Sequence, residues 1–334
     1  MKTALVTGSL GQDGTYLTEH LLELGYKVFC GIRRDPRSAQ TIEKATWAQK
    51  IMETGNVEFV YLDMRDELSI RTAIRKSWPD EIYNLAGQVY VPLSWEMPEE
   101  TFDVNTGGLA RILKVVEYLK KDTKVYQASS SEMFGNQEGA CTVETQMRPT
   151  SPYGVSKFAA HKLVSLYRDK GIFAVGGILF NHESPRRGHE MVTRKIAKHV
   201  AAWATGSSHN LYMGHLNSRR DWGFAGEYVK AMHLMLQREV PMDYVVGTGE
   251  SHSVADFLEA ARIEMGLSKD FVDAHTCLDE RFVRTQEIFD MRADNTELLQ
   301  ELFWVPQVKF TGLVSLMVRA EYEKLKGKEE VARA

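Results

Sequence analysis

The sequence predicts an α/β protein with a doubly wound parallel sheet and a smaller, mixed α/β C-terminal region. Three observations predict this fold. Short β-rich runs alternate with segments of helical period through the first half of the 334 residues, which is typical of βαβ units. Three glycines follow the first expected strand directly and open a helix. After about Arg186 the alternation gives way to a mixed pattern, in which polar and glycine-bearing turns separate the helices.

The elements expected in the first part alternate along the chain. Strands are expected at Thr3–Thr7, Lys27–Ile32, Val57–Leu62, Glu81–Leu85, Lys124–Ala128 and Phe173–Leu179. Helices are expected at Tyr16–Leu24, Glu67–Ile74, Thr106–Leu119 and Ser151–Tyr167. We expect these elements to form one domain over residues 1–185. The second region, residues 186–334, is interleaved with it and has expected helices at Thr193–Ala204, Gly226–Gln237 and Val254–Met265.

The composition is that of an ordinary globular protein, with 43% hydrophobic and 26% charged residues. A formal net charge of -4 provides no basic surplus for nucleic acid. No apolar run approaches the roughly 20 residues that a membrane helix needs, so we expect no membrane partner. The three cysteines lie far apart in the sequence, which favours neither a disulfide framework nor a metal site. We therefore expect a cytoplasmic, unprocessed protein with reduced thiols.

The glycine-rich turn after the first strand indicates a dinucleotide site. Gly8, Gly11 and Gly14 stand in the stretch VTGSLGQDGTYL. Glycines at this place permit a tight turn and let backbone N–H groups approach a pyrophosphate at a helix N-terminus. Gln12 and Asp13 lie in the same turn and are counted with the cofactor site. A purely structural turn is the alternative.

The end of the second strand favours NADP over NAD. Arg33 and Arg34 occupy the place where NAD enzymes usually carry an acid for the ribose 2′-hydroxyl, and basic residues there accommodate a 2′-phosphate. The alternative is a solvated basic loop in which Asp35 serves as a late NAD acid. Further cofactor contacts are expected after the third and fourth strands, at Asp63, Met64, Leu85, Ala86 and Gln88.

A proton-transfer group is expected on the helix that begins near Ser151. Tyr153 and Lys157 are four residues apart, which places both side chains on one helix face. An ammonium beside a phenol favours the phenolate, so we expect a lowered tyrosine pKa. Ser130, at the end of the fifth strand, would supply a third hydroxyl, with Ser129 and Ser131 as competing candidates.

Glu132 raises a separate question, because hydride transfer to or from a carbinol needs a hydroxyl, a phenol and an ammonium but no carboxylate. A helix cap or a surface charge is the plain interpretation of a glutamate at this position.

These motifs together resemble the extended short-chain dehydrogenase/reductases, a Rossmann-like superfamily, over nearly the whole chain. Within it the sequence resembles the GDP-mannose 4,6-dehydratase family. The resemblance rests on TGSLGQDGTYL, PDEIYNLA, YQASSSEMFG, RPTSPYGVSK, GILFNHESPRRG, VTRKI and RRDWGFAGEYV.

The resemblance implies a redox-neutral dehydration of a GDP-sugar with bound NADP. Hydride leaves C4 of the sugar, water is lost across C5 and C6, and hydride returns to C6. Glu132 then has a role as the base at C5 and the acid at the departing C6 hydroxyl. Ser130, Tyr153 and Lys157 serve the chemistry at C4.

Motif matching extends the resemblance to the remaining site residues. His182 and Arg187 correspond to cofactor contacts. The residues corresponding to substrate contacts are Asn181, Val192, Lys195, Arg220, Arg284 and Glu287. Arginine suits a diphosphate because its planar fork forms paired, charge-assisted hydrogen bonds. Relatives form dimers or tetramers, the tetramers through the segment after Arg34, so a homo-oligomer is expected.

The sequence departs from the family pattern at three places, which leaves alternatives open. Ser130 replaces the usual threonine and keeps the hydroxyl. Gly87, Val89 and Tyr90 are closer to the GDP-4-keto-6-deoxy-mannose reductases, so an NADPH-dependent reductase is one alternative. The stretch VRTQEIFDMRADN departs from the corresponding motif of the family, so a 4,6-dehydratase acting on a GDP-manno-heptose is another alternative. An epimerase, or a non-catalytic dinucleotide sensor, would share the fold.

Overall fold

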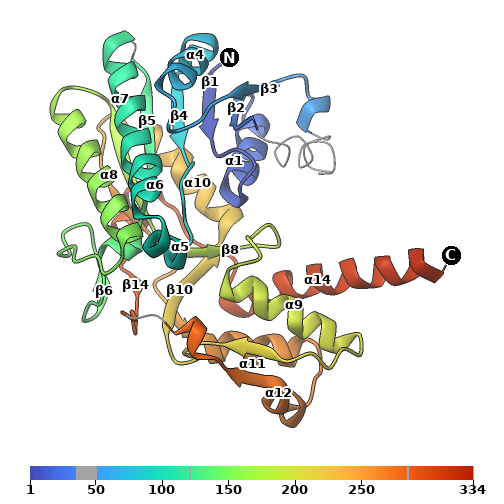
Figure 1. The fold of residues 1–334 in the computed structure, drawn as a ribbon. Helices are drawn as coiled ribbons and strands as arrows, with labels where there is room; N and C mark the ends of the chain where they lie inside the picture. Colours follow the sequence, from blue (N-terminus) through green and yellow to red (C-terminus); the bar gives the residue numbers. More distant parts are fainter. Residues whose placement is uncertain (35–50, 120–121, 284–285, 334) are drawn as a thin grey trace.

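A parallel sheet forms the centre of the computed structural model, which describes residues 1–34, 51–119, 122–283 and 286–333, with side chains described through residue 327 (Figure 1). Within these residues the sheet has seven strands in the order β11-β7-β5-β4-β1-β2-β3. Their bounds are β1 Thr3–Thr7, β2 Lys27–Ile32, β3 Val57–Tyr61, β4 Glu81–Asn84, β5 Lys124–Ser130, β7 Ala174–Leu179 and β11 Tyr244–Val246. The strand order reverses beside β1, where open α/β sheets bind their ligands.

Helices cover both faces of the sheet (Figure 1). On one face lie α1 (Gln12–Glu23) and α10 (Ala225–Leu236), whose apolar side chains pack on those of β1, β2, β4 and β5. On the other face lie α4 (Glu67–Ser77), α7 (Gly108–Leu119) and α8 (Pro152–Asp169). The predicted doubly wound α/β class is therefore confirmed.

The connection between β4 and α7 is the main departure from the predicted elements of the first part. It contains α5 (Val91–Glu96), α6 (Pro98–Phe102) and a π-helical turn at Asp103–Gly107 that runs directly into α7. Helix α1 also begins four residues earlier than predicted, because the glycine turn leads into the helix without a linker.

The smaller C-terminal region has its own core between three helices, α9 (Val192–Ala204), α11 (Val254–Glu264) and α14 (Phe310–Arg333). Its other helices are α12 (Lys269–His275) and α13 (Thr296–Leu302). Its short strands are β8 Asn181–Glu183, β9 Leu211–Met213, β10 Arg219–Phe224, β12 Ser251–Ser253 and β13 Thr276–Leu278, while β14 Arg292–Ala293 pairs with β6 Ala140–Cys141. Strands β8, β10 and β12 form one small sheet.

Asp221 joins the elements of this region to the edge of the main sheet. The fully buried carboxylate on β10 accepts hydrogen bonds from the Thr248 amide at 2.8 Å, the Thr248 hydroxyl at 2.6 Å and the Gly249 amide at 2.9 Å. It also accepts the Ala293 amide at 3.1 Å. Burial raises the pKa of Asp221, while these donors lower it in part.

We expect Asp221→Ala to lower the free energy of unfolding by about 3 kcal/mol, because it leaves several buried donors without an acceptor. Urea unfolding followed by circular dichroism measures this loss. Asp294→Ala is the matched control, because that carboxylate accepts an exposed local bond from Thr296 at 3.0 Å. Equal losses for the two variants would contradict the role of Asp221.

Candidate active site

The glycine turn at the end of β1 is a narrow cradle. Gly8 has a φ of +65°, and a Cβ there would lie 2.9 Å from the Ala86 amide nitrogen. A Cβ on Gly14 would lie 2.3 Å from the Gly8 carbonyl oxygen, and the Gly11 amide donates to that same oxygen at 2.9 Å. Side chains are excluded at these points, so backbone amides face the mouth of α1. This geometry fits the pyrophosphate of a dinucleotide.

The turn is fixed to β8 by a second set of contacts. The Asp13 carboxylate lies 2.8 Å from His182 Nε2, and Gln12 Nε2 donates to the His182 carbonyl at 3.0 Å. Burial alone would raise the pKa of Asp13, but the charge and hydrogen bond of His182 outweigh it and lower that pKa. Burial lowers the pKa of His182, and Asp13 more than reverses this. The structure thus brings three of the predicted cofactor residues together.

The basic pair after β2 is exposed at the carboxyl edge of the sheet. The guanidinium carbon of Arg34 lies 4.4 Å from the centre of the Tyr61 ring. Asp63 lies nearby: its hydrogen bonds from Arg65 chiefly lower its pKa, and the charge of Arg33 lowers it further. Met64 packs closely against Gly108, because a Cβ on Gly108 would lie 2.5 Å from Cε of Met64. Asp35 and the segment expected at a tetramer contact lie outside the described residues.

Leu85, Ala86 and Gln88 line the path from the glycine turn toward the catalytic helix. The Thr7 hydroxyl accepts the Leu85 amide at 3.1 Å and the Ala86 amide at 3.0 Å. The side-chain oxygen of Gln88 is buried and has no hydrogen-bond partner among the described residues. An orphaned acceptor at this place fits a donor from a bound cofactor.

Asn105 is a site residue that the sequence reasoning missed. Its side chain accepts the Gln88 amide at 2.9 Å and donates to the Gln88 carbonyl at 3.0 Å and to the Ser156 hydroxyl at 2.9 Å. It therefore fixes the loop after β4 to helix α8. Asn105 lies in the π-helical turn, and such turns occur frequently at functional sites. The signal available in the sequence was an asparagine directly before the helix expected at Thr106–Leu119.

The predicted catalytic residues meet at the end of β5. Tyr153 and Lys157 are buried in the first turns of α8, which Ser151 caps by accepting the Gly154 amide at 3.0 Å. Lys157 Nζ donates to the Ala128 carbonyl at 3.0 Å and lies 5.9 Å from the centre of the Tyr153 ring. The Ser130 hydroxyl acts on the Tyr153 phenol and lowers its pKa.

Glu132 is half-buried in the short 3₁₀ turn Ser131–Met133 that follows β5. Its amide donates to the Ser130 hydroxyl at 3.3 Å. A Cβ on Gly154 would lie 2.7 Å from the Glu132 carbonyl oxygen, so the helix approaches this turn as closely as glycine allows. The carboxylate acts electrostatically on Tyr153 and raises its pKa, so the two side chains share one environment.

Of the two competing serines, Ser129 has another partner. The Ser129 hydroxyl lies 3.0 Å from His161 Nδ1, on the opposite side of β5 from Ser130, as strand alternation requires. Ser131 is buried at the start of the 3₁₀ turn. Ser130 is the serine whose hydroxyl acts on the Tyr153 phenol and lowers its pKa.

The prediction of a lowered tyrosine pKa is wrong for this structure. Burial raises the pKa of Tyr153 to about 12, which outweighs the hydrogen bond from Ser130. Burial also lowers the pKa of Lys157 to about 8, and the charge of Asp13 offsets this only in part. The ammonium bonds a backbone carbonyl rather than the phenol, so it does not offset the burial of Tyr153.

The described residues predicted to contact substrate lie on β8, on α9, on β10 and in the segment before β14. Arg220 and Glu287 form an ion pair at 3.1 Å, with side chains 9% and 10% exposed. Lys195 donates to the Tyr212 carbonyl and lies 3.5 Å from the centre of the Phe282 ring. Asn181 begins β8 and Val192 begins α9, while Arg187 Nε lies 3.1 Å from the Glu183 carboxylate. Arg284 is outside the described residues.

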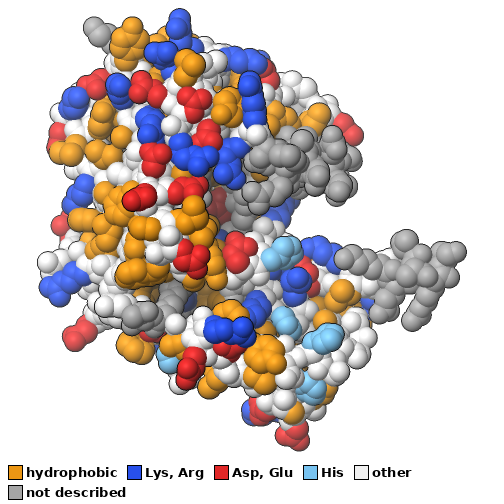
Figure 2. Space-filling view, viewed as in Figure 1, with side chains coloured by type: hydrophobic (Ala, Val, Ile, Leu, Met, Phe, Trp, Pro, Cys, Tyr) orange, Lys and Arg blue, Asp and Glu red, His pale blue; other side chains and the backbone are white. Residues whose placement is uncertain are grey.

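The surface is hollowed between the sheet and the smaller C-terminal region (Figure 2). Within the described residues, no group of three or more His, Cys, Asp or Glu side chains could hold a metal ion. None of the helices in that part of the chain is both long and apolar enough to cross a membrane.

Comparison with known proteins gives one consistent result. The family model described as GDP-mannose 4,6 dehydratase matches residues 5–317. GDP-mannose 4,6 dehydratase 2 from Arabidopsis thaliana is 43% identical over 332 residues, which cover 97% of this chain and 88% of that protein. GDP-mannose 4,6 dehydratase from Homo sapiens is 40% identical and covers 97% of this chain and 92% of that protein.

A solved structure of similar fold is dTDP-glucose 4,6-dehydratase from Streptomyces venezuelae with NAD bound. It superimposes with a TM-score of 0.84 over 98% of each chain, at 19% sequence identity. At this identity the likeness concerns the fold alone.

We expect the Lys157 ammonium to titrate near pH 8, well below the usual 10.5, because burial penalises the charged form. The unfolded chain then binds more protons between these values, so stability should rise with pH across that interval. Carbon-13 NMR of lysine labelled at Cε measures the titration, and Lys157→Arg assigns the resonance. A midpoint near 10.5 would show that the side chain is solvated.

Proposed function

Because this chain belongs to the GDP-mannose 4,6-dehydratase family, we propose that it converts GDP-mannose to GDP-4-keto-6-deoxy-mannose, as a lyase without net oxidation or reduction. The observation that carries this proposal is the position of Glu132. A half-buried carboxylate two residues after Ser130, close enough to act on Tyr153 through its charge, is not needed for hydride transfer alone. It is needed for the loss of water.

The cofactor we propose is NADP. When bound, it accepts a hydride from C4 of the sugar and returns it to C6. The narrow glycine turn, the orphaned Gln88 oxygen and the Asp13–His182 pair support a dinucleotide at this place. The exposed pair Arg33 and Arg34 supports a 2′-phosphate on the adenosine ribose. Asp63 and Met64 would flank the adenine, while Leu85 and Ala86 would line the cofactor's path.

The side chains at the end of β5 divide the proton transfers between them. Tyr153, once it is a phenolate, takes the proton of the C4 hydroxyl, and the Ser130 hydroxyl holds that oxygen beside the phenol. The C4 ketone acidifies the C5 proton, which passes to the Glu132 carboxylate. The same proton then goes to the hydroxyl leaving C6, so that water departs and the carboxylate is restored. The proton that Tyr153 took from the C4 hydroxyl accounts for the proton that C5 gains when hydride returns to C6.

The substrate contacts are proposals from motif matching and from the structure. Arg220 would bind the diphosphate, exchanging its present partner Glu287 for the ligand. Lys195 and Val192, at the start of α9, would line the nucleotide-sugar pocket, and Asn181 would orient the sugar. Arg284 and Glu287 would contact ribose or hexose. These residues lie mainly in the region that we propose as substrate-binding, residues 186–334.

Neither alternative reaction is favoured, because the similar relatives are dehydratases of GDP-mannose. The residue types at Gly87, Val89 and Tyr90, which resemble those of the reductases, therefore do not decide the reaction. Glu132 also argues against a non-catalytic sensor, since a sensor needs no proton path.

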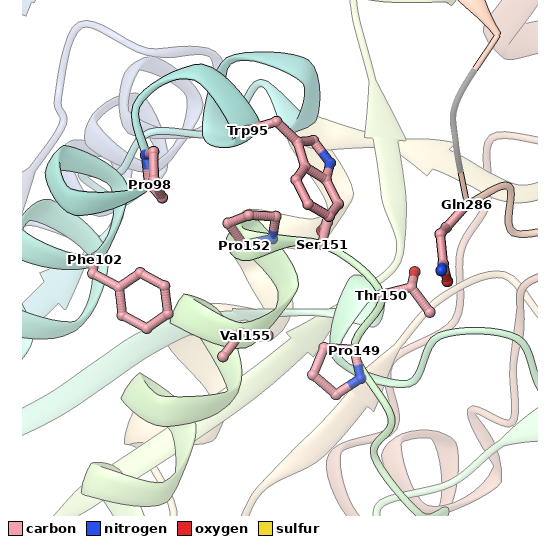
Figure 3. A pocket seen from close by; sticks show the side chains of 9 residues that line it. All are labelled: Trp95, Pro98, Phe102, Pro149, Thr150, Ser151, Pro152, Val155 and Gln286. Atoms are coloured by element: carbon pink, nitrogen blue, oxygen red, sulfur yellow. The ribbon is translucent and has the colours of Figure 1, made fainter.

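We also propose a cytoplasmic homo-oligomer, dimer or tetramer. A cavity of about 520 Å³ lies outside the catalytic group, between α5, α6 and the start of α8, and its lining is mainly apolar (Figure 3). Trp95 and Val155 on its rim are 58% and 39% exposed. An exposed apolar hollow supports a protein contact at this face.

Incubation of purified protein with GDP-mannose, without added NADPH, should give a product about 18 mass units lighter, since one water is lost and the hydride is recycled. Mass spectrometry detects it. Glu132→Gln should lower kcat by roughly a thousandfold, because the amide cannot accept the C5 proton.

Cofactor binding by Glu132→Gln should remain that of the parent, and Glu138→Gln, an exposed carboxylate of the following loop, serves as the matched control. Full dehydration by Glu132→Gln would end the assignment of the carboxylate. A requirement for stoichiometric NADPH would instead identify a reductase.

Replacing Arg33 and Arg34 together with alanine should weaken NADP binding by roughly a hundredfold while changing NAD affinity little. Two charge-assisted contacts to the 2′-phosphate are lost, each contributing about 1.5 kcal/mol. Titration calorimetry with both nucleotides measures the difference. Equal weakening of NADP and NAD would show that the pair serves only the structure of the loop.

A further inference from the structure

A buried ion pair joins the C-terminal helix to the start of α9. Arg194 Nη2 lies 2.6 Å from the Glu321 carboxylate, and the two side chains are only 6% and 9% exposed. Lys324, which is 52% exposed, approaches the same carboxylate at 3.0 Å from the solvent side. The pair thus lies between α9 and α14, in the core of the smaller region.

The guanidinium of Arg194 has a second set of partners on the loop after β8. Its Nη1 donates to the Pro185 carbonyl at 2.7 Å and to the Arg187 carbonyl at 2.6 Å. One planar group therefore spans the carboxylate of α14 and two backbone acceptors in the segment Ser184–Met191. A guanidinium can hold all three because its donors point in fixed directions.

The same loop is also fixed on its other side, toward the cofactor turn. Arg186 forms a paired interaction with the Glu19 carboxylate on α1, with both nitrogen to oxygen distances at 2.9 Å. Arg187 belongs to the backbone that these contacts of Arg194 and Arg186 hold, and its charge lowers the pKa of Asp13 and of Tyr153. The contacts thus fix the stretch of backbone from which Arg187 acts on the site.

Stability alone is a weak explanation for burying these charges. Desolvation of two ions offsets much of their attraction, and apolar side chains of similar volume often serve a core as well or better. What apolar side chains cannot supply is a fixed donor for the Pro185 and Arg187 carbonyls. The buried Arg194–Glu321 ion pair is explained if it serves to fix the position of the Ser184–Met191 loop.

We propose that Arg194 and Glu321 are positioning residues that hold the Ser184–Met191 loop so that Arg187 faces the cofactor. Glu321 orients the guanidinium, and the guanidinium fixes the loop backbone. The C-terminal helix therefore contributes to the cofactor site without touching it. The cofactor part of this inference rests on the proposed function, while the fixing of the loop does not.

Two variants test the proposal. The double variant Arg194→Met with Glu321→Leu removes both charges and fills the space. Arg194→Lys keeps a cation opposite Glu321 but lacks the fork that bonds both carbonyls. For each we would measure the thermal unfolding midpoint, amide hydrogen exchange of the Ser184–Met191 segment without ligand, and NADP dissociation by calorimetry.

We expect both variants to exchange amide hydrogens in this segment, and to release NADP, on the order of tenfold more readily than the parent. Arg319→Ala is the matched control, because Arg319 lies on the same helix as Glu321 and its exposed side chain pairs with Glu264 at the end of α11. It should leave the exchange and the NADP affinity unchanged.

Parent-like exchange in Arg194→Lys, or in a double variant that keeps its unfolding midpoint, would overturn the proposal. Faster exchange with unchanged NADP affinity would overturn the link to the cofactor. A parent protein without NADP affinity would contradict the proposed cofactor instead, and the exchange measurement would still decide the role of the pair.

Discussion

The site depends on how closely helix α8 can approach the end of β5. Gly154 makes this approach possible, because a Cβ there would lie 2.7 Å from the Glu132 carbonyl and 3.0 Å from Pro149. Once the helix lies against the strand, Lys157 reaches the Ala128 carbonyl and Tyr153 reaches Ser130. One missing side chain thus fixes the spacing between a phenol, a hydroxyl and a carboxylate.

The same close packing sets the electrostatics of the site. Burial makes each ion less favourable, so it raises the pKa of Tyr153 and lowers that of Lys157. The pKa values therefore shift in the directions that favour the neutral phenol and the neutral amine. A neutral phenol cannot take a second proton, so Tyr153 must lose its own proton before it can accept that of a substrate hydroxyl.

The sequence allowed the local parts of this arrangement to be predicted, and the structure explains why the others escaped. Glycines directly after a strand can be interpreted from a few neighbouring residues. The same holds for the four-residue spacing of Tyr153 and Lys157. Asn105 escaped because its function depends on a π-helical turn that brings it against Gln88 and Ser156. The direction of the Tyr153 pKa was wrong because helix spacing gives no measure of burial.

Distant pairs escaped for a related reason. Asp221 meets Thr248 and Ala293 through the fold alone, and Arg194 meets Glu321 across more than a hundred residues of chain. A charged residue read in isolation is most often a surface charge, and these three are buried. Resemblance to a family supplied the GDP-sugar substrate, which no spacing in the sequence defines, whereas the glycine turn and the Arg33–Arg34 pair already predicted the dinucleotide.

The turn that carries Glu132 is not independent of the region that we propose to bind substrate. Asn136, four residues farther along, donates to the Glu287 carbonyl at 2.8 Å and accepts the Phe289 amide at 2.9 Å. Glu287 in turn pairs with Arg220. An anion that drew Arg220 away from Glu287 would therefore act on a segment bonded to the loop that follows Glu132. The ion pair and the turn are joined through a short chain of hydrogen bonds, so a ligand bound at Arg220 would influence the position of the Glu132 carboxylate.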